Sequence, residues 1–304
     1  MPAQLCVKGT KLSNQISLCV GAPKCGTTWL DELLRDQFPG RLPQYCKETF
    51  FFDKQYSRGI DWYRSLFAPE CEAPIEIGPS YFAESDAPRR ISEHYERRRI
   101  LIMLRDPYDR AASNLLHEMR RGRTWLSPEK CTVSRRSMEL VSAYSSYESN
   151  VRMWQETNPE VLAVVRFPVS DPEWFCGVLK TFLLEEADDT SDLLKKVQQH
   201  LRTRVYEAGF PRSQTSARLR EVVRKLVPTR MHRSAQGLAA KSNPGSPSSD
   251  DRSRELRKLA NVKAQELFDF EVDREWLEEQ VGKTGFVWKN GTPVQVSEGV
   301  QSQG

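Results

Sequence analysis

The chain has 304 residues, of which 38% are hydrophobic and 28% are charged, an ordinary composition for a folded protein. Its formal net charge of +4 is too small to indicate a nucleic-acid-binding protein. Clusters of arginine, such as Arg120, Arg121 and Arg123, favour an anionic cofactor or substrate. The sequence contains no apolar run of about 18 residues that would span a membrane, and no signal-peptide pattern at its start. We therefore expect a cytoplasmic protein with no nucleic-acid partner and no membrane span.

The seven cysteines are odd in number and irregularly spaced, and no two of them form a CxxC pair. This pattern predicts neither a zinc site nor a disulfide framework. We expect free thiols in a reducing compartment and no bound metal.

The first predicted element is a strand, a loop and a helix in succession. An alternating apolar run precedes the loop at 21–28, and apolar residues at helical spacing follow it. Backbone N–H groups of such a loop and of the first helical turn bind phosphate oxygens. Gly21 and Gly26 have the spacing of the P-loop in nucleoside triphosphatases, but Thr27 replaces the lysine of those proteins, and Lys24 lies inside the loop. At that position the lysine can reach the bridging oxygen of a group being transferred.

Later segments continue the alternation of strands and helices. Apolar runs predict buried strands, and helical spacing predicts helices; the strands are expected at 75–77, 100–104 and 161–165, and the helices after Pro107, over 137–157 and from Pro172. This order predicts an α/β fold with a P-loop-like, doubly wound parallel sheet flanked by helices. A helical part is expected at its C-terminal end.

We expect one domain at 15–290, with an N-terminal extension at 1–14 and a C-terminal tail at 291–304. Ser, Pro and Gly are frequent over 234–253, which predicts a disordered linker or a flexible loop over the site. A helix should follow and close the core, with its apolar positions at Leu256, Leu259, Val262, Leu267 and Phe268.

A second candidate phosphate site lies at the end of the strand over 100–104. Arg105 follows this strand, and Ser113 lies one to two turns into the next helix. A guanidinium fork and a hydroxyl in this arrangement can hold one phosphate. The alternative role of Arg105 is an ion pair with Asp106 or Asp109.

Together these two motifs resemble those of the sulfotransferases that use 3′-phosphoadenosine 5′-phosphosulfate (PAPS). The resemblance covers residues 15–184, and it is strongest to the branch of the heparan sulfate glucosaminyl sulfotransferases and their bacterial relatives. The loop for the 5′-phosphosulfate matches residues 22–30, and the element for the 3′-phosphate matches 104–113.

The resemblance implies PAPS as the cofactor and assigns a role to each matching residue. Lys24 would contact the sulfate and the bridging oxygen, Thr27 and Thr28 the 5′-phosphate, and Arg105 with Ser113 the 3′-phosphate. The other cofactor contacts would be Pro23, Cys25 and Gly26 from the loop, Trp29 directly after it, Lys241 from the segment at 234–253 and Arg233 directly before that segment.

A third motif, Lys47-Glu48 followed by Phe51-Phe52-Asp53, is similar to the 3-O-sulfotransferase segment that supplies the catalytic base. The resemblance makes Glu48 the group that deprotonates the acceptor, and the expected acceptor contacts are Lys47, Phe52, Asp53 and Tyr81. The alternative role of Glu48 is a surface ion pair with Lys47 or Lys54.

Two positions depart from the 3-O-sulfotransferase pattern. Phe50 replaces a histidine two residues after Glu48, and Ile77 replaces a lysine, so the match does not predict heparan sulfate as the acceptor.

The predicted function is transfer of a sulfuryl group from PAPS to a hydroxyl or amine of a carbohydrate or other small molecule. One alternative is a P-loop kinase for a nucleoside or sugar, which would need Mg²⁺ and a lysine where this chain has Thr27. Another is a nucleotide-binding protein of the same fold without activity. The motifs leave the acceptor open.

Overall fold

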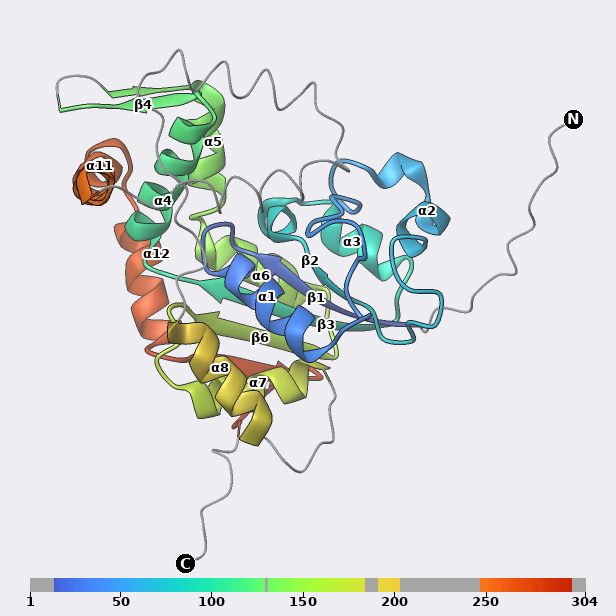
Figure 1. Ribbon diagram of the computed structural model, residues 1–304. Helices are drawn as coiled ribbons and strands as arrows, with labels where there is room; N and C mark the ends of the chain where they lie inside the picture. Colours follow the sequence, from blue (N-terminus) through green and yellow to red (C-terminus); the bar gives the residue numbers. More distant parts are fainter. Residues whose placement is uncertain (1–13, 129–130, 184–190, 203–246, 297–304) are drawn as a thin grey trace, which may run out of the picture.

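The computed structural model describes residues 14–128, 131–183, 191–202 and 247–296. Its central sheet is built from six described strands: β1 (Gln15–Gly21), β2 (Ile75–Ile77), β3 (Arg97–Leu104), β6 (Val161–Arg166), β7 (Gly285–Lys289) and β8 (Thr292–Val294). The strand order is β2-β1-β3-β6-β7-β8 (Figure 1). The first four strands are parallel, which confirms the predicted α/β fold. β7 and β8 extend the sheet in antiparallel fashion as far as Val294, beyond the expected domain end at 290.

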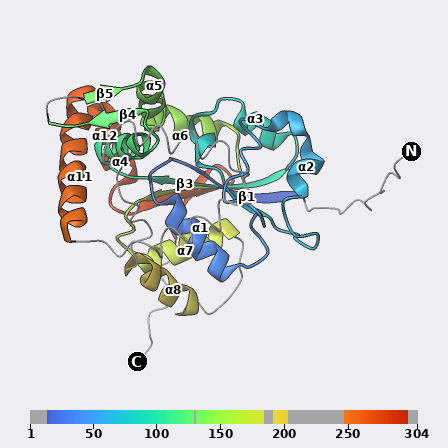
Figure 2. The same cartoon turned by 45° about the horizontal axis from the view of Figure 1, so that its top comes forward.

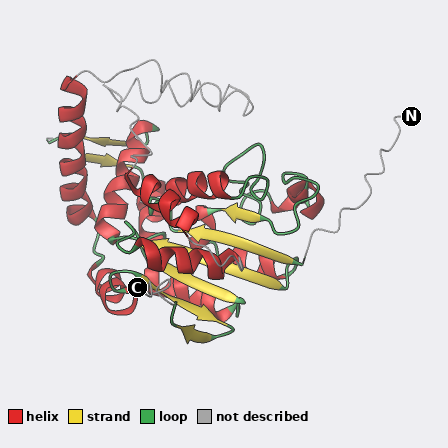
Figure 3. Cartoon of the chain, turned by 60° about the horizontal axis from the view of Figure 1, so that its bottom comes forward, coloured by secondary structure: helices red, strands yellow, loops and turns green. Residues whose placement is uncertain are grey.

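Helices cover both faces of this sheet (Figure 3). Those of the described residues are α1 (Thr27–Gln37), α2 (Ile60–Arg64), α3 (Ala87–Ser92), α4 (Pro107–Arg120), α5 (Arg135–Ala143), α6 (Tyr147–Glu156), α7 (Pro172–Leu183), α8 (Ser191–Arg202), α11 (Pro247–Leu267) and α12 (Glu271–Trp276). Three short turns are also helical: η1 (Tyr56–Arg58), η2 (Pro79–Ala83) and the π-helical η3 (Leu277–Val281). Figure 2 shows α1, α7 and α8 below the sheet and α3 and α6 above it. No helix among the described residues is both long enough and apolar enough to cross a membrane.

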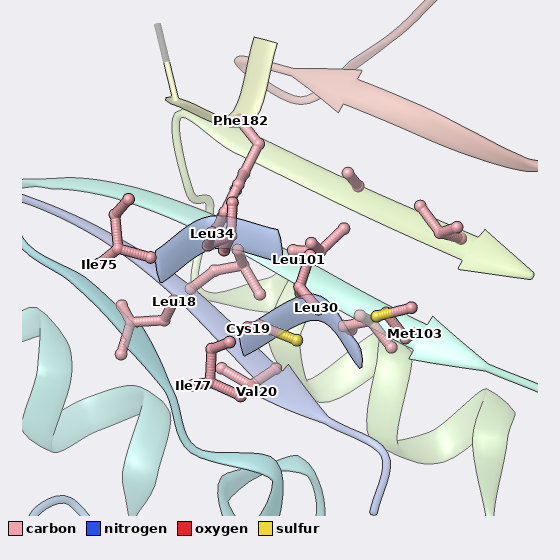
Figure 4. Packing of buried hydrophobic residues seen from close by; sticks show 14 of the residues in the cluster. Leu18, Cys19, Val20, Leu30, Leu34, Ile75, Ile77, Leu101, Met103 and Phe182 are labelled. Atoms are coloured by element: carbon pink, nitrogen blue, oxygen red, sulfur yellow. The ribbon is translucent and has the colours of Figure 1, made fainter. Parts of the chain in front are cut away.

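The core is densest between α1 and the middle of the sheet. Leu30 and Leu34 of α1 lie over Leu101 of β3 and over β1 (Figure 4), and all three leucines are fully buried. β1 and β3 carry continuous buried runs because helices cover the sheet on both sides. Cys19 in β1 is also fully buried and acts as a small apolar side chain in this core. This packing fixes the end of β1 relative to the start of α1.

The single helix expected over 137–157 is two helices, α5 and α6. Arg110 donates to the carbonyl oxygen of Val141 (2.6 Å), which in a continuous helix would accept from Ser145. The Ser145 amide bonds the oxygen of Ser142 instead (2.9 Å), and Ser146 begins the next helix. A buried side chain from α4 thus ends α5.

A second apolar cluster lies beside the main core, between α4 and α11 and below a small hairpin of β4 (Thr124–Leu126) and β5 (Cys131–Val133). α11 contributes Leu256, Ala260 and Ala264, which recur every four residues, and Phe268 directly after the helix continues this spacing. The expected core position Val262 is 49% exposed, so this part of the prediction is wrong. α11 also begins at Pro247, inside the segment at 234–253 that was expected to be a loop. The rest of that segment lies outside the described residues.

Candidate active site

The loop between β1 and α1 is fixed against the neighbouring strand. The amide of Ala22 donates to the carbonyl oxygen of Met103 in β3 (2.8 Å). Lys24 and Gly26 both have positive φ, at 72° and 88°, which turns the chain sharply before α1. A Cβ atom at Gly26 would lie 2.5 Å from the Phe167 ring, so only glycine fits there. The loop therefore has one backbone shape, with the first amides of α1 at its end.

Lys24 lies among cations that come from the C-terminal part of α4. Burial lowers its pKa to about 8; the charges of Arg120 and Arg121 act in the same direction, and Glu48 opposes them. His117 belongs to the same group, because burial and then the charge of Lys24 lower its pKa to about 2. A cationic region of this kind attracts a phosphate or sulfate group.

The lowered pKa of Lys24 makes stability depend on pH. The unfolded chain binds a proton at Lys24 up to its ordinary pKa of 10.5, whereas the folded protein releases it above about 8. We expect the free energy of unfolding to rise with pH across this window, because the unfolded state then binds more protons. Denaturant titrations of the ligand-free protein and of Lys24→Met across this range measure the effect. An equal pH dependence in the two proteins would contradict it.

Arg105 lies at the junction of β3 and α4, next to the loop. Its carbonyl oxygen accepts from the hydroxyl of Tyr147 (2.8 Å), and its Nη2 donates to Asp109 Oδ2 (2.9 Å). The alternative ion pair with Asp109 is therefore formed, but it is partly exposed and of the kind that contributes little to stability.

The Nε of Arg105 is buried without a hydrogen-bond partner. Ser113 lies four residues beyond Asp109, on the same side of α4, so a phosphate between Arg105 and Ser113 would have two donors.

Lys47 links the start of α1 to Glu48. Its Nζ lies 3.0 Å from Thr28 Oγ1 and 3.3 Å from Glu48 Oε1. The alternative pair of Glu48 with Lys47 is thus present, and the Glu48 side chain remains 25% exposed. Since Lys24 and Glu48 also interact electrostatically, the loop and the third motif belong to one site.

Two expected acceptor contacts lie in the core. Phe52 and Tyr81 are fully buried, and the hydroxyl of Tyr81 donates to Glu76 Oε1 (2.8 Å). A buried side chain offers no surface to an acceptor, so we do not include these two residues among the acceptor contacts that we propose. The Asp53 side chain is only 4% exposed and pairs with Lys54 (3.3 Å).

Glu76 was not singled out from the sequence, although it organises this region. It is fully buried in β2, accepts from Tyr63 (2.7 Å) and also bonds Thr49, the neighbour of Glu48. Desolvation raises its pKa, and the three hydroxyls of Thr49, Tyr63 and Tyr81 oppose that rise. The hydrogen bonds of Glu76 connect β2 to Thr49 and so fix the backbone next to Glu48. The available signal in the sequence was the position of Glu76 between two isoleucines.

The remaining cofactor contacts expected from the sequence divide into three groups. Cys25 and Trp29 have buried side chains, so only their backbone groups can face a ligand. Pro23 and Thr28 are half-buried in the loop and the first helical turn. Arg233 and Lys241 lie outside the described residues, so their predicted phosphate contacts stay predictions.

The sequence predicted an anionic ligand from the cluster with Arg120 and Arg121, but it did not assign these arginines or His117 to this site. His117 follows Ser113 by four residues, and Arg120 and Arg121 come one turn later, at the end of α4, so all lie along one side of the helix. This spacing was the signal that could have assigned them. Among the described residues, no three His, Cys, Asp or Glu side chains lie where they would hold a metal ion.

Comparisons with known proteins agree with this arrangement. Residues 15–167 match the family model described as "Sulfotransferase domain". The chain is 34% identical over 141 residues to mouse heparan sulfate glucosamine 3-O-sulfotransferase 3A1, covering 46% of this chain and 35% of that protein. It is 30% identical over 192 residues to the human protein of the same name, covering 60% and 47%. The chain thus spans less than half the length of these relatives.

A solved sulfotransferase from Alicyclobacillus acidocaldarius is 26% identical, with a TM-score of 0.46, covering 62% of this chain and 91% of that one. The family match spans the sheet from β1 to β6 and every motif from the Lys24 loop to Ser113. The chain therefore belongs to the sulfotransferase domain family.

Proposed function

We propose that the protein transfers a sulfuryl group from PAPS to a hydroxyl or amine of an acceptor. The observation that carries this proposal is the junction of the two phosphate motifs at one edge of the sheet. β1 and β3 are adjacent parallel strands, and the hydrogen bond from Ala22 to Met103 joins their carboxyl ends. The Lys24 loop and Arg105 therefore lie side by side, at the edge where α/β proteins bind their ligands.

The residues present fit such a cofactor. The glycine-restricted loop and the start of α1 suit one phosphate, and the buried, unpartnered Nε of Arg105 suits another. When bound, PAPS would supply an activated sulfuryl group whose leaving group is a phosphate. Lys24, Thr27 and Thr28 would hold the 5′ side, and Arg105 with Ser113 the 3′-phosphate.

The chain's own groups would then act on either side of the transferred group. Glu48 accepts the proton of the acceptor through a carboxylate oxygen. Lys24 and the loop amides stabilise negative charge that develops on the leaving phosphate. Lys47, within reach of both Thr28 and Glu48, orients the carboxylate relative to the loop.

The acceptor class we propose is a carbohydrate or another small hydroxyl- or amine-bearing molecule. The similar proteins named above act, by their names, on a glucosamine of heparan sulfate. Ile77 is fully buried where that pattern has a lysine, so this chain lacks that cation for a sulfated acceptor. None of the six described cysteines forms a disulfide bond. A screen of acceptors with sulfate-labelled PAPS tests the proposal directly.

Nucleotide discrimination separates this function from a kinase. We expect adenosine 3′,5′-bisphosphate to bind far more tightly than AMP, ADP or ATP, without Mg²⁺. A charge-assisted hydrogen bond contributes roughly 1.5–3 kcal/mol, so Arg105→Ala should weaken bisphosphate binding about tenfold to a hundredfold. AMP binding should change little, because AMP lacks the 3′-phosphate. Calorimetric titration of both nucleotides into both proteins measures the difference.

Asp109→Asn provides a matched control for this experiment. It removes the present partner of Arg105 without removing the guanidinium, so bisphosphate binding should be kept or strengthened. Equal affinity of the wild type for AMP and the bisphosphate, or tight Mg²⁺-dependent binding of ATP, would overturn the proposed function.

A further inference from the structure

Arg110 of α4 is a fully buried cation without a carboxylate partner among the described residues. Its Nε and Nη2 donate to Ser145 Oγ (3.0 and 2.7 Å), and Nη2 also donates to the Val141 carbonyl (2.6 Å). Its Nη1 is buried and has no hydrogen-bond partner. The guanidinium is thus bonded only to neutral groups.

The position of Arg110 relates it to both phosphate motifs. The groups that influence its pKa, after burial, are Tyr147, Cys25, Tyr144 and Arg105. Cys25 belongs to the Lys24 loop, and Tyr147 holds the carbonyl oxygen of Arg105 (2.8 Å). Arg110 is therefore buried close to both the loop and the β3–α4 junction.

A buried charge without a counter-charge is unfavourable, and arginine does not escape this by losing its proton. Burial lowers the pKa of Arg110, and the neighbouring Arg105 acts in the same direction. Arg99 is a useful contrast, because it is equally buried at the opposite end of β3 but has Glu160 at 3.5 Å. Among the described residues, Glu160 supplies a counter-charge to Arg99, and no carboxylate supplies one to Arg110.

We propose that the counter-charge of Arg110 is the anionic nucleotide bound between the Lys24 loop and Arg105, so that Arg110 is a positioning residue that strengthens this site. The proposal rests on the proposed function. Arg110 acts on this site through space, and its hydrogen bonds to Ser145 and Val141 also couple the site to the turn between α5 and α6. Because the charge is buried, salt should screen its effect weakly.

Two variants separate the charge from the hydrogen bonds. Arg110→Lys keeps the charge and loses the fork, whereas Arg110→Gln keeps donor and acceptor groups and loses the charge. We expect Arg110→Gln to weaken binding of adenosine 3′,5′-bisphosphate on the order of tenfold, at low and at high salt. Arg110→Lys should bind within a few-fold of the wild type. The control Arg99→Gln should lower the melting temperature of the ligand-free protein and leave affinity unchanged.

Calorimetric affinities and melting temperatures with and without the bisphosphate measure these effects. Equal weakening of bisphosphate binding by Arg110→Lys and Arg110→Gln would assign the effect of Arg110 to its hydrogen bonds. Unchanged affinity in Arg110→Gln would show that Arg110 has no effect on binding. Either result overturns the inference about Arg110 and leaves the proposed function standing. If Arg110→Gln does not fold, wild-type affinity in a folded Arg110→Lys supports the charge, and strong weakening in it contradicts the charge. A wild type that does not bind the bisphosphate overturns the proposed function, and the inference with it.

Discussion

Replacing Lys24 with alanine is expected to lower the rate of sulfuryl transfer on the order of 10²–10³-fold, the usual effect of removing one preorganised charge-stabilising donor. The structure gives the physical reason. Lys24 lies in a loop of fixed shape with positive φ, next to the start of α1, where negative charge on a leaving phosphate would develop. The fold should survive, because the side chain belongs to neither apolar cluster.

Initial rates of labelled-sulfate transfer, with an acceptor found in the screen, measure this effect. Lys54→Ala is the matched control, since the Lys54 side chain is 61% exposed and lies over the Phe50 ring, outside the loop. Circular dichroism should be the same for both variants and the wild type. Turnover of Lys24→Ala close to that of the wild type would remove Lys24 from the proposed mechanism.

The parts of the fold that the sequence predicts well are those set by local pattern. The strand, loop and helix around Lys24 follow from periodicity and glycine spacing, and Pro107 with Asp106 marks the start of α4. Asp106 accepts from the amide of Asp109 (3.0 Å), as a helix cap does. Since β1 and β3 are parallel, the strand ends also bring the two phosphate motifs to one edge of the sheet.

The parts that the sequence predicts poorly depend on partners distant in the chain. β7 is a strand because it pairs with β6, and the sequence pattern of this five-residue segment near the C-terminus does not predict that pairing. The break between α5 and α6 depends on a hydrogen bond from Arg110. Residue pattern also cannot separate a buried tyrosine from one in a cleft, so Tyr81 was assigned to the acceptor although its hydroxyl binds Glu76.

The candidate site shows the same division. The sequence predicts Lys24, Arg105 and Glu48 from their motifs, and the structure brings Lys24 and Glu48 within electrostatic range. The competing ion pairs of Arg105 with Asp109 and of Glu48 with Lys47 are both formed as well. These ion pairs do not exclude the roles predicted from the motifs, because both pairs are partly exposed and therefore weak. A ligand phosphate can replace Asp109 as the partner of Arg105, and an acceptor can replace Lys47 as the partner of Glu48.

Replacing Glu48 with glutamine is expected to lower turnover roughly 10²–10⁴-fold, the range for removing a general base, while binding of adenosine 3′,5′-bisphosphate is kept. Glutamine has nearly the same shape and still offers an oxygen to Lys47, so the contacts from Lys47 to Thr28 and to position 48 can persist. The amide cannot accept the acceptor's proton. The loss should therefore fall on kcat.

Transfer kinetics and calorimetric titration of the bisphosphate, on the same preparations, separate these effects. Glu93→Gln is the matched control, because Glu93 is an exposed carboxylate that bonds Tyr56 (2.6 Å) and plays no part in the proposed chemistry. Thr49 should remain bonded to Glu76, so the network beneath position 48 is not expected to change. An equal loss of nucleotide affinity and of rate in Glu48→Gln would assign Glu48 to the nucleotide pocket or to a structural pair with Lys47. Loss of rate alone, absent in Glu93→Gln, is the result that a base facing the acceptor requires.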